Sequence, residues 1–146
     1  MTRERQNAVQ RIVDELEDEA ERVAAVRQLL TAEELLLLSE AYNWDDGMVI
    51  PTAMIHHRCC DLGLALRLFE LAEGIVWLTE KNDWKYQEAW AAFCKDLASR
   101  VQRGAYVAGA VAYESSLSAV QRHKALKAGV PAIFLTSVQA NNESPA

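Results

Sequence analysis

Residues 61–79 read DLGLALRLFELAEGIVWLT, a stretch with few polar positions. Four of the exceptions are spaced four, three and four residues apart, and they share one narrow strip of a helix: Gly63, Arg67, Glu70 and Gly74. A helix that is apolar around most of its circumference is buried. With Asp61 as N-cap, the stretch therefore predicts a central helix over about residues 62–79.

The chain before this stretch predicts three more helices. An apolar seam recurs every seven residues, from Val9 through Leu16 and Val23 to Leu30, and predicts one helix over about residues 3–29. Thr31 followed by Glu34 is a capping box for a second, short helix. Residues 43–47 are turn formers that end it, and Pro51 suits the first position of a short third helix.

The chain after the central stretch predicts two helices and an extended segment. Asn82-Asp83 is expected to cap a helix that ends before Gly104, with a buried stripe of Tyr86, Trp90, Phe93, Leu97 and Val101. Ser118 is expected to cap a short basic helix ended by Gly129. Residues 130–135 are expected to be extended. The fold class is therefore all-α: a compact single-domain bundle of about six helices over residues 1–138, with a polar tail at 139–146.

Composition and charge limit the function classes. The chain has 146 residues, 51% of them hydrophobic, and its formal net charge is −6. Residues 1–46 hold 12 acidic and 5 basic residues, so the acidity lies in the first third. Such a surface disfavours nucleic acid and anionic membranes and favours a basic protein partner. A charged N-terminus and three cysteines, an odd number, favour a cytoplasmic protein with reduced thiols.

Catalytic and cofactor motifs are missing. The sequence has neither a Gly-x-Ser-x-Gly elbow nor a phosphate-binding glycine loop, so we expect no enzyme activity and no cofactor. The best metal candidate is the cluster from His56 to Cys60, where His56 and Cys59, or His57 and Cys60, have helical spacing. The two pairs point about 100° apart on a helix, so they do not converge. We expect Cys60 to pack inward and the histidines to lie near the surface.

Asp45 and Asp46 are paired carboxylates beside Trp44. They could act as general acid and base, or as oxygen ligands of a divalent cation. The simpler interpretation is a helix-ending turn in which an aspartate caps backbone amides while Trp44 fills the core.

Two motifs carry a resemblance. Tyr42-Asn43-Trp44-Asp45-Asp46-Gly47, Ile50-Pro51 and Cys60-Asp61-Leu62-Gly63 resemble a bacterial domain of unknown function with a Y-N-W-D-D-G turn and a C-D-L-G helix start. Leu64 stands where that family has Thr. The resemblance implies that the motif residues define the fold: Tyr42, Trp44, Asp45, Asp46, Gly47, Cys60, Asp61 and Gly63. It also implies an immunity protein of a type VI secretion effector, with a restriction-nuclease-like toxin as a candidate target.

The leading functional hypothesis is therefore an immunity protein that binds a cognate toxin in the cytosol without chemistry. Its candidate contacts are acidic: Glu15, Glu17, Asp18, Glu19, Glu21, Asp45 and Asp46. A first alternative is a structural or regulatory module that forms a homodimer through the seam of the first helix. A second is a metal-dependent protein that uses the Asp45/Asp46 turn or the cluster from His56 to Cys60.

Overall fold

The chain forms an all-α fold in the computed structural model, which describes residues 1–80 and 87–141. Within these ranges the α-helices are α1 (Arg3–Asp14), α2 (Glu19–Arg27), α3 (Ala32–Ala41), α4 (Val49–Ile55), α5 (Leu62–Leu71), α6 (Gly74–Thr79), α7 (Glu88–Gln102) and α8 (Ala119–Lys127). Two 3₁₀ helices cover Trp44–Asp46 and Ala132–Leu135. The predicted fold class is confirmed.

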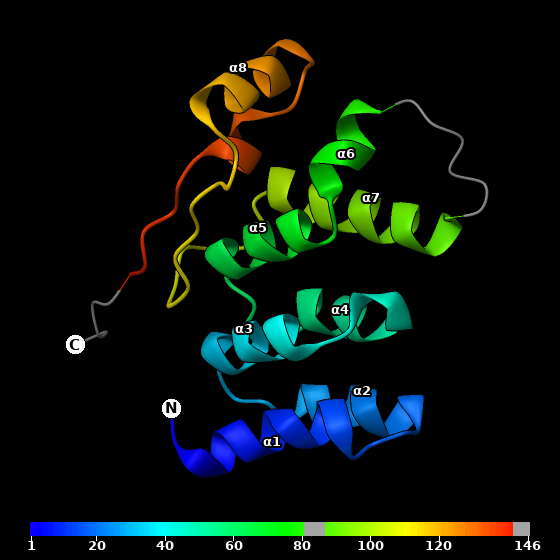
Figure 1. The fold of residues 1–146 in the computed structure, drawn as a ribbon. Helices are drawn as coiled ribbons and strands as arrows, with labels where there is room; N and C mark the ends of the chain where they lie inside the picture. The colour runs from blue at the N-terminus through cyan, green and yellow to red at the C-terminus, as the bar shows by residue number, and fades with distance from the viewer. Residues whose placement is uncertain (81–86, 142–146) are drawn as a thin grey trace.

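The helices stack in layers (Figure 1). The α1–α2 hairpin lies at one end and packs on α3 and α4, and α5 rests on α3 and contacts α7. Helix α8 lies at the opposite end of the molecule, above α5. The core runs through all these layers, and its largest fully buried side chains include Ile12, Leu38, Met54, Leu64 and Leu97. This layering decides which surfaces remain free.

The single helix predicted over residues 3–29 is wrong, because the chain reverses at residues 15–18. The Asp18 carboxylate accepts a hydrogen bond from the Glu21 amide at 3.1 Å and starts α2 afresh. Arg22 then donates to the Ile12 carbonyl at 3.1 Å, across the hairpin. A straight helix of this length would be about 40 Å long. The reversal lets Val9 and Val26 reach one core, where both are buried.

The central helix is likewise two helices. Glu73 has a left-handed backbone, with φ 57°, between α5 and α6. A β-carbon at Gly74 would lie 2.4 Å from the Phe69 ring, so glycine lets the chain fold back closely. The Trp90 indole donates to the Ala72 carbonyl at 2.6 Å and satisfies an acceptor that the break releases. Helix α5 is the buried part of the predicted helix.

The predicted caps Thr31, Asp61 and Ser118 are confirmed, and Ser118 with Gln121 forms a capping box at the start of α8. The predicted capping box of α3 is only half formed, because the Glu34 carboxylate accepts from Arg5 and from the Thr31 hydroxyl. Gly104 and Gly129 follow α7 and α8 with positive φ of 77° and 95°. Helix α4 begins at Val49, two residues before the predicted Pro51. The predicted cap of the α7 segment, Asn82-Asp83, and its first stripe residue, Tyr86, lie outside the described residues.

The extended segment predicted at residues 130–135 is wrong, because Ala132–Leu135 form a 3₁₀ helix. This turn places Phe134 in the core, where its ring stacks on Phe69 with centroids 4.5 Å apart. Tyr113 and Val138 form an isolated antiparallel bridge that ties the segment after this turn to the loop before α8. The tail prediction falls mostly on residues 142–146, which lie outside the described residues.

Candidate functional site

Two turns far apart in the sequence meet at one end of the molecule. The α1–α2 turn and the α3–α4 turn are joined by Arg22, whose guanidinium lies 5.7 Å from the centre of the Tyr42 ring. The pKa of the Tyr42 phenol is raised by burial and by the negative charges of Asp46 and Glu19, while Arg22 opposes them. Carboxylates from both turns therefore raise the pKa of the same side chain, Tyr42.

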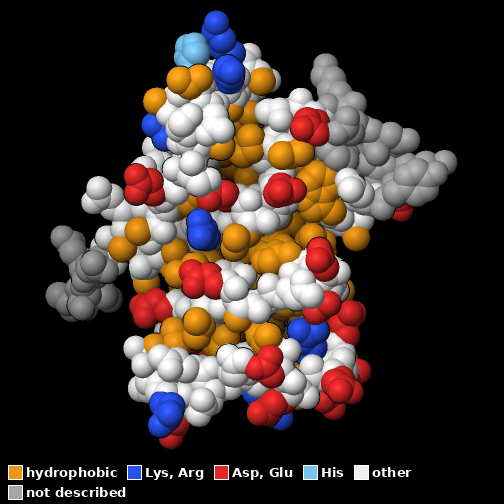
Figure 2. All heavy atoms as spheres, viewed as in Figure 1, with side chains coloured by type: hydrophobic (Ala, Val, Ile, Leu, Met, Phe, Trp, Pro, Cys, Tyr) orange, Lys and Arg blue, Asp and Glu red, His pale blue; other side chains and the backbone are white. Residues whose placement is uncertain are grey.

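We call this surface the acidic end; it comprises seven exposed carboxylates: Glu15, Glu17, Asp18, Glu19, Glu21, Asp45 and Asp46. Figure 2 shows Asp and Glu side chains gathered on the side where these two turns lie. The structure thus brings together the two groups of acidic residues that the sequence offered separately.

Asn43, not an aspartate, caps the turn at residues 43–47. Its side-chain oxygen accepts from the Asp45 amide at 3.1 Å, which corrects the expected aspartate cap. The Tyr42 hydroxyl donates to the Gly47 carbonyl at 2.8 Å, and the Trp44 indole donates to the Ser39 carbonyl at 3.1 Å. The aromatic residues therefore hold the turn, and the carboxylates of Asp45 and Asp46 are left exposed to solvent.

The C-D-L-G motif clamps the loop before α8 onto α5. The two carboxylate oxygens of Asp61 accept from the amides of Leu64, at 2.9 Å, and Val111, at 3.1 Å. The Leu62 amide donates to the Val107 carbonyl at 2.8 Å. Gly63 lies directly against the Val111 backbone. These contacts are internal to the chain, so this motif acts on the fold rather than on the exposed surface.

An apolar groove of about 550 Å³ opens next to the acidic end, between α2, α4 and α7. Its apolar lining comes from all three helices: Val23, Met48, Val49, Ala53, Ala89, Ala92 and Phe93. Val49 is 44% exposed, a high value for valine. The groove could not be predicted from the sequence, because each helix contributes only a few of its small or apolar residues and they follow no local pattern.

A chain of polar contacts lies at one side of the groove. The His56 ring contacts the Asp96 carboxylate at 2.9 Å, and Asp96 also accepts from Arg100 at 3.0 Å. A histidine held by a carboxylate can relay protons. His56 and Asp96 are both partly exposed, at 44% and 39% of their side chains, so solvent reaches this pair.

The cluster from His56 to Cys60 does not converge. His57 is 8% exposed, which corrects the expectation that both histidines lie near the surface. Its Nδ1 accepts from the Cys59 amide at 3.0 Å, so the proton lies on Nε2, which donates to the Leu29 carbonyl at 2.9 Å. Cys60 is buried as predicted, and burial raises the pKa of its thiol. In the described parts of the chain, no three His, Cys, Asp or Glu side chains are grouped to hold a metal ion.

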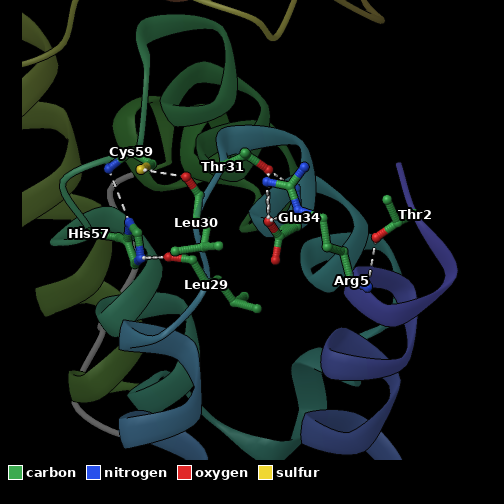
Figure 3. A network of polar contacts seen from close by, with 8 residues as sticks. All are labelled: Thr2, Arg5, Leu29, Leu30, Thr31, Glu34, His57 and Cys59. Atoms are coloured by element: carbon green, nitrogen blue, oxygen red, sulfur yellow. Dashed lines mark hydrogen bonds and ion pairs between the residues drawn. The ribbon is translucent and has the colours of Figure 1, made fainter.

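A second set of polar contacts secures the link between α2 and α3 (Figure 3). Glu34 is 2% exposed, and its carboxylate accepts from Arg5 at 2.9 Å and from the Thr31 hydroxyl at 3.1 Å. On the other side of the link, Cys59 donates to the Leu30 carbonyl at 3.3 Å. The link is therefore held by contacts from both α1 and the segment between α4 and α5.

Comparison with known families places a match on the middle of the chain. Residues 31–102 match the model of a family described as Domain of unknown function (DUF4274). The matched segment runs from the cap of α3 to the end of α7 and contains both motifs, the turn at residues 42–47 and the clamp at residues 60–63. The match supports a domain of unknown function over these residues.

No curated protein and no solved structure matches the chain. Among the helices that the structure describes, none combines the length and hydropathy needed to cross a membrane.

Proposed function

We propose that this protein is an immunity protein that binds a cognate secreted bacterial toxin and neutralises it by protein–protein contact. The observation that carries the proposal is the acidic end. Two turns about 25 residues apart along the sequence present their carboxylates on one surface, beside an apolar groove. A surface of this kind fits a basic site on another protein, such as the nucleic-acid-binding cleft of a nuclease.

Glu15 of the acidic end lies at a helix C-terminus, as do Asp14 and Glu40, and their charges are unfavourable there, which supports a role in binding. Asp18, Glu19 and Glu21 instead lie at the start of α2, where negative charge is favourable. The C-terminal end of a helix carries partial negative charge, so acidic residues there are unfavourable. Asp14 ends α1 and Glu15 is its C-cap, while Glu40 lies in the last turn of α3, which contains no basic residue. Residues that lower stability are retained where function needs them.

Complementary charge would act mainly on the rate of capture. Opposite surface potentials speed the encounter of two proteins and make it salt-dependent. Fast capture suits an immunity protein, because free toxin is lethal to the cell that makes it. The groove beside the acidic end would supply the apolar contact that slows dissociation.

The test uses the product of the gene adjacent to the gene for this chain. That product is expressed in a bacterial host with and without this protein, and growth and complex formation are measured. We expect the product to stop growth, and co-expression to restore growth with a complex that survives gel filtration. A harmless product, or a toxic one that this chain neither binds nor neutralises, would rule out the proposal.

A charge-reversal comparison then tests the acidic end itself. The triple variant Glu15→Lys, Glu17→Lys and Asp46→Lys should lower the association rate about tenfold or more at low salt. The matched control carries the same charge change on exposed residues elsewhere: Glu4→Lys, Glu33→Lys and Glu114→Lys. Equal rates for the two triple variants would place the toxin on another surface.

A further inference from the structure

A second pocket, of about 440 Å³, lies between α6 and α7. Figure 1 shows α6 and α4 on different sides of α7, and none of the described residues lines both this pocket and the groove between α2, α4 and α7. Pockets of roughly 300 to 1,000 Å³ hold small-molecule ligands. The α6–α7 pocket is therefore large enough for a small molecule and is separate from the groove beside the acidic end.

The apolar part of the pocket lining comes from both helices. Trp77 and Leu78 of α6 are partly buried, and Ala98 of α7 is buried with a side chain of only one methyl group. The indole N–H groups of Trp44 and Trp90 donate to backbone carbonyls, but that of Trp77 has no acceptor within the described ranges. The pocket thus offers a planar aromatic ring whose polar group is still free.

Hydrogen-bond donors line the pocket in one row along α7. Lys95, Ser99 and Arg103 follow one another at intervals of four residues, so they lie on one face of the helix, with the hydroxyl between the two cations. Arg103 is the C-cap of α7, and its amide still donates to the Ser99 carbonyl at 3.0 Å, so the row extends to it. The hydroxyls of Ser39 and Thr79 donate to helix carbonyls, whereas the Ser99 hydroxyl has no partner in the described ranges.

No carboxylate neutralises the two cations of this row. Neither Asp nor Glu is among the lining residues, and within residues 1–80 and 87–141 neither Lys95 nor Arg103 forms an ion pair. Arg100 on the same helix, by contrast, pairs with Asp96. The helix offers Lys95 no acidic neighbour, because the positions three and four residues away are uncharged: Ala91, Ala92, Ala98 and Ser99. The pocket therefore presents unpaired positive charge, although the chain as a whole carries a net charge of −6.

We propose that the α6–α7 pocket binds a nucleoside monophosphate, with the phosphate on the donor row of α7 and the base against Trp77. A phosphate monoester has three terminal oxygens that accept hydrogen bonds, which suits an ammonium, a hydroxyl and a guanidinium in one row. A carboxylate has only two such oxygens and half the charge. The planar base stacks on an indole ring, and Leu78 and Ala98 add apolar contact.

Binding at this site should be weak and salt-dependent. Lys95, Ser99 and Arg103 are exposed, so water competes for each hydrogen bond and salt screens the charges. We therefore expect a dissociation constant of about 1 mM at low salt, which rises as the salt concentration increases.

The test titrates the full chain with AMP and follows the Trp77 indole N–H signal in ¹H–¹⁵N spectra, with Trp77→Phe to assign that signal. We expect AMP to shift this signal together with the backbone amides of Ser99 and Gln102. Adenosine and inorganic phosphate each carry only one part of the ligand, so each should bind about tenfold more weakly or worse. No shift with AMP at about 10 mM, or adenosine binding as tightly as AMP, would overturn the proposal.

A pair of double variants tests the donor row itself. Lys95→Gln with Arg103→Gln removes both cations and should weaken AMP binding about tenfold, while adenosine binding stays unchanged. The matched control, Lys124→Gln with Lys127→Gln, removes the same charge from α8 and should bind AMP like the wild type. All four lysine and arginine side chains are exposed, so both variants should fold, which circular dichroism and the urea midpoint check. An equal loss in the two double variants would mean that AMP responds only to net charge and would overturn the proposal.

A further titration identifies the source of the nucleotide. Equal affinities for AMP and for a 5′-phosphorylated oligonucleotide would support a free nucleotide as the ligand, since the rest of the strand then adds no contact. Binding of the oligonucleotide about tenfold more tightly than AMP would support the phosphorylated end of a strand in the same pocket.

Discussion

The backbone of Gly63 and the carbonyl of Val111 touch, although 48 positions separate them in the sequence. A β-carbon on Gly63 would lie 1.9 Å from the Val111 oxygen, well inside van der Waals contact. The neighbouring Asp61 carboxylate accepts from the Val111 amide at 3.1 Å, so both polar groups of that residue face the start of α5. The loop before α8 therefore lies as close to the helix as a glycine allows.

Replacing Gly63 with alanine should destabilise the fold by about 3 kcal/mol, because the obstructing atom is backbone and cannot rotate away. Urea denaturation measures the change. Gly129→Ala is the control: it meets nothing within 4 Å and adds only the strain of a left-handed backbone, about 1 kcal/mol. A smaller loss for Gly63→Ala than for Gly129→Ala would contradict the close contact.

The Arg5–Glu34 pair should be asymmetric. Arg5→Met removes the partner of a carboxylate that is 2% exposed, and it should cost about 3 kcal/mol. Glu34→Gln leaves an acceptor in place and a guanidinium that reaches water, so it should cost about 1 kcal/mol. Chemical denaturation of the two variants compares them. A larger loss of stability for Glu34→Gln than for Arg5→Met would mean that Thr31, rather than Arg5, stabilises the buried charge of Glu34.

Stability should fall below pH 6.5 because of His57. Burial lowers the pKa of His57 below its ordinary value, and the charge of Arg58 acts in the same direction, while the bonds to the Leu29 and Arg27 carbonyls oppose it. The unfolded chain then binds a proton that the folded chain does not. The contribution is complete above about pH 6.5 and is lost as the pH falls toward the lower folded pKa.

Protonation would also turn Nδ1 into a donor facing the Cys59 amide, itself a donor. Urea midpoints measured between pH 7.5 and pH 5 should decline in the wild type. The decline should be smaller in His57→Gln, which is less stable but cannot titrate there. An unchanged slope in that variant would show that His57 does not cause the decline.

Removing negative charge from the C-terminal ends of α1 and α3 should stabilise the protein. Glu40→Gln, in the last turn of α3, and Glu15→Gln, the C-cap of α1, should each raise the free energy of unfolding by about 0.3 to 1 kcal/mol at low salt. Glu33→Gln is the matched control on the first turn of α3, where it should have the opposite sign. A lower free energy of unfolding for Glu40→Gln and Glu15→Gln would show that these carboxylates are not unfavourable at the helix C-termini.

The sequence predicted the helices that begin with a strong local signal. Thr31 and Ser118 are capping residues whose hydrogen bonds lie within four residues, so the local sequence alone locates the starts of α3 and α8. The breaks at residues 15–18 and at Glu73 escaped prediction, since the apolar pattern continues through both. They exist because distant residues require them: Val9 and Val26 must share a core, and Trp90 and Phe69 pack against the reversal after α5.

The acidic residues of the candidate site were predictable one by one, because exposed carboxylates in turns follow from composition. The contact between the two turns that carry them was not predictable. It involves Arg22 of α2 stacked on Tyr42 of the α3–α4 turn. The groove needed three helices in place before it could be recognised, as Val23, Val49 and Ala92 are separated by 26 and 43 positions. Residues that form a surface only after the helices pack together show no recognisable pattern in the sequence.

Two of the three thiols are buried, which leaves the third as a site for attaching a fluorescent label. Cys60 and Cys94 are buried, and burial raises the pKa of both, that of Cys94 to about 12. Thiolate is the reactive form, so the half-buried Cys59 is the one that a maleimide dye should modify first. A single fluorophore would then sit beside the link between α2 and α3, near one end of the groove, and could report binding there without any engineered cysteine.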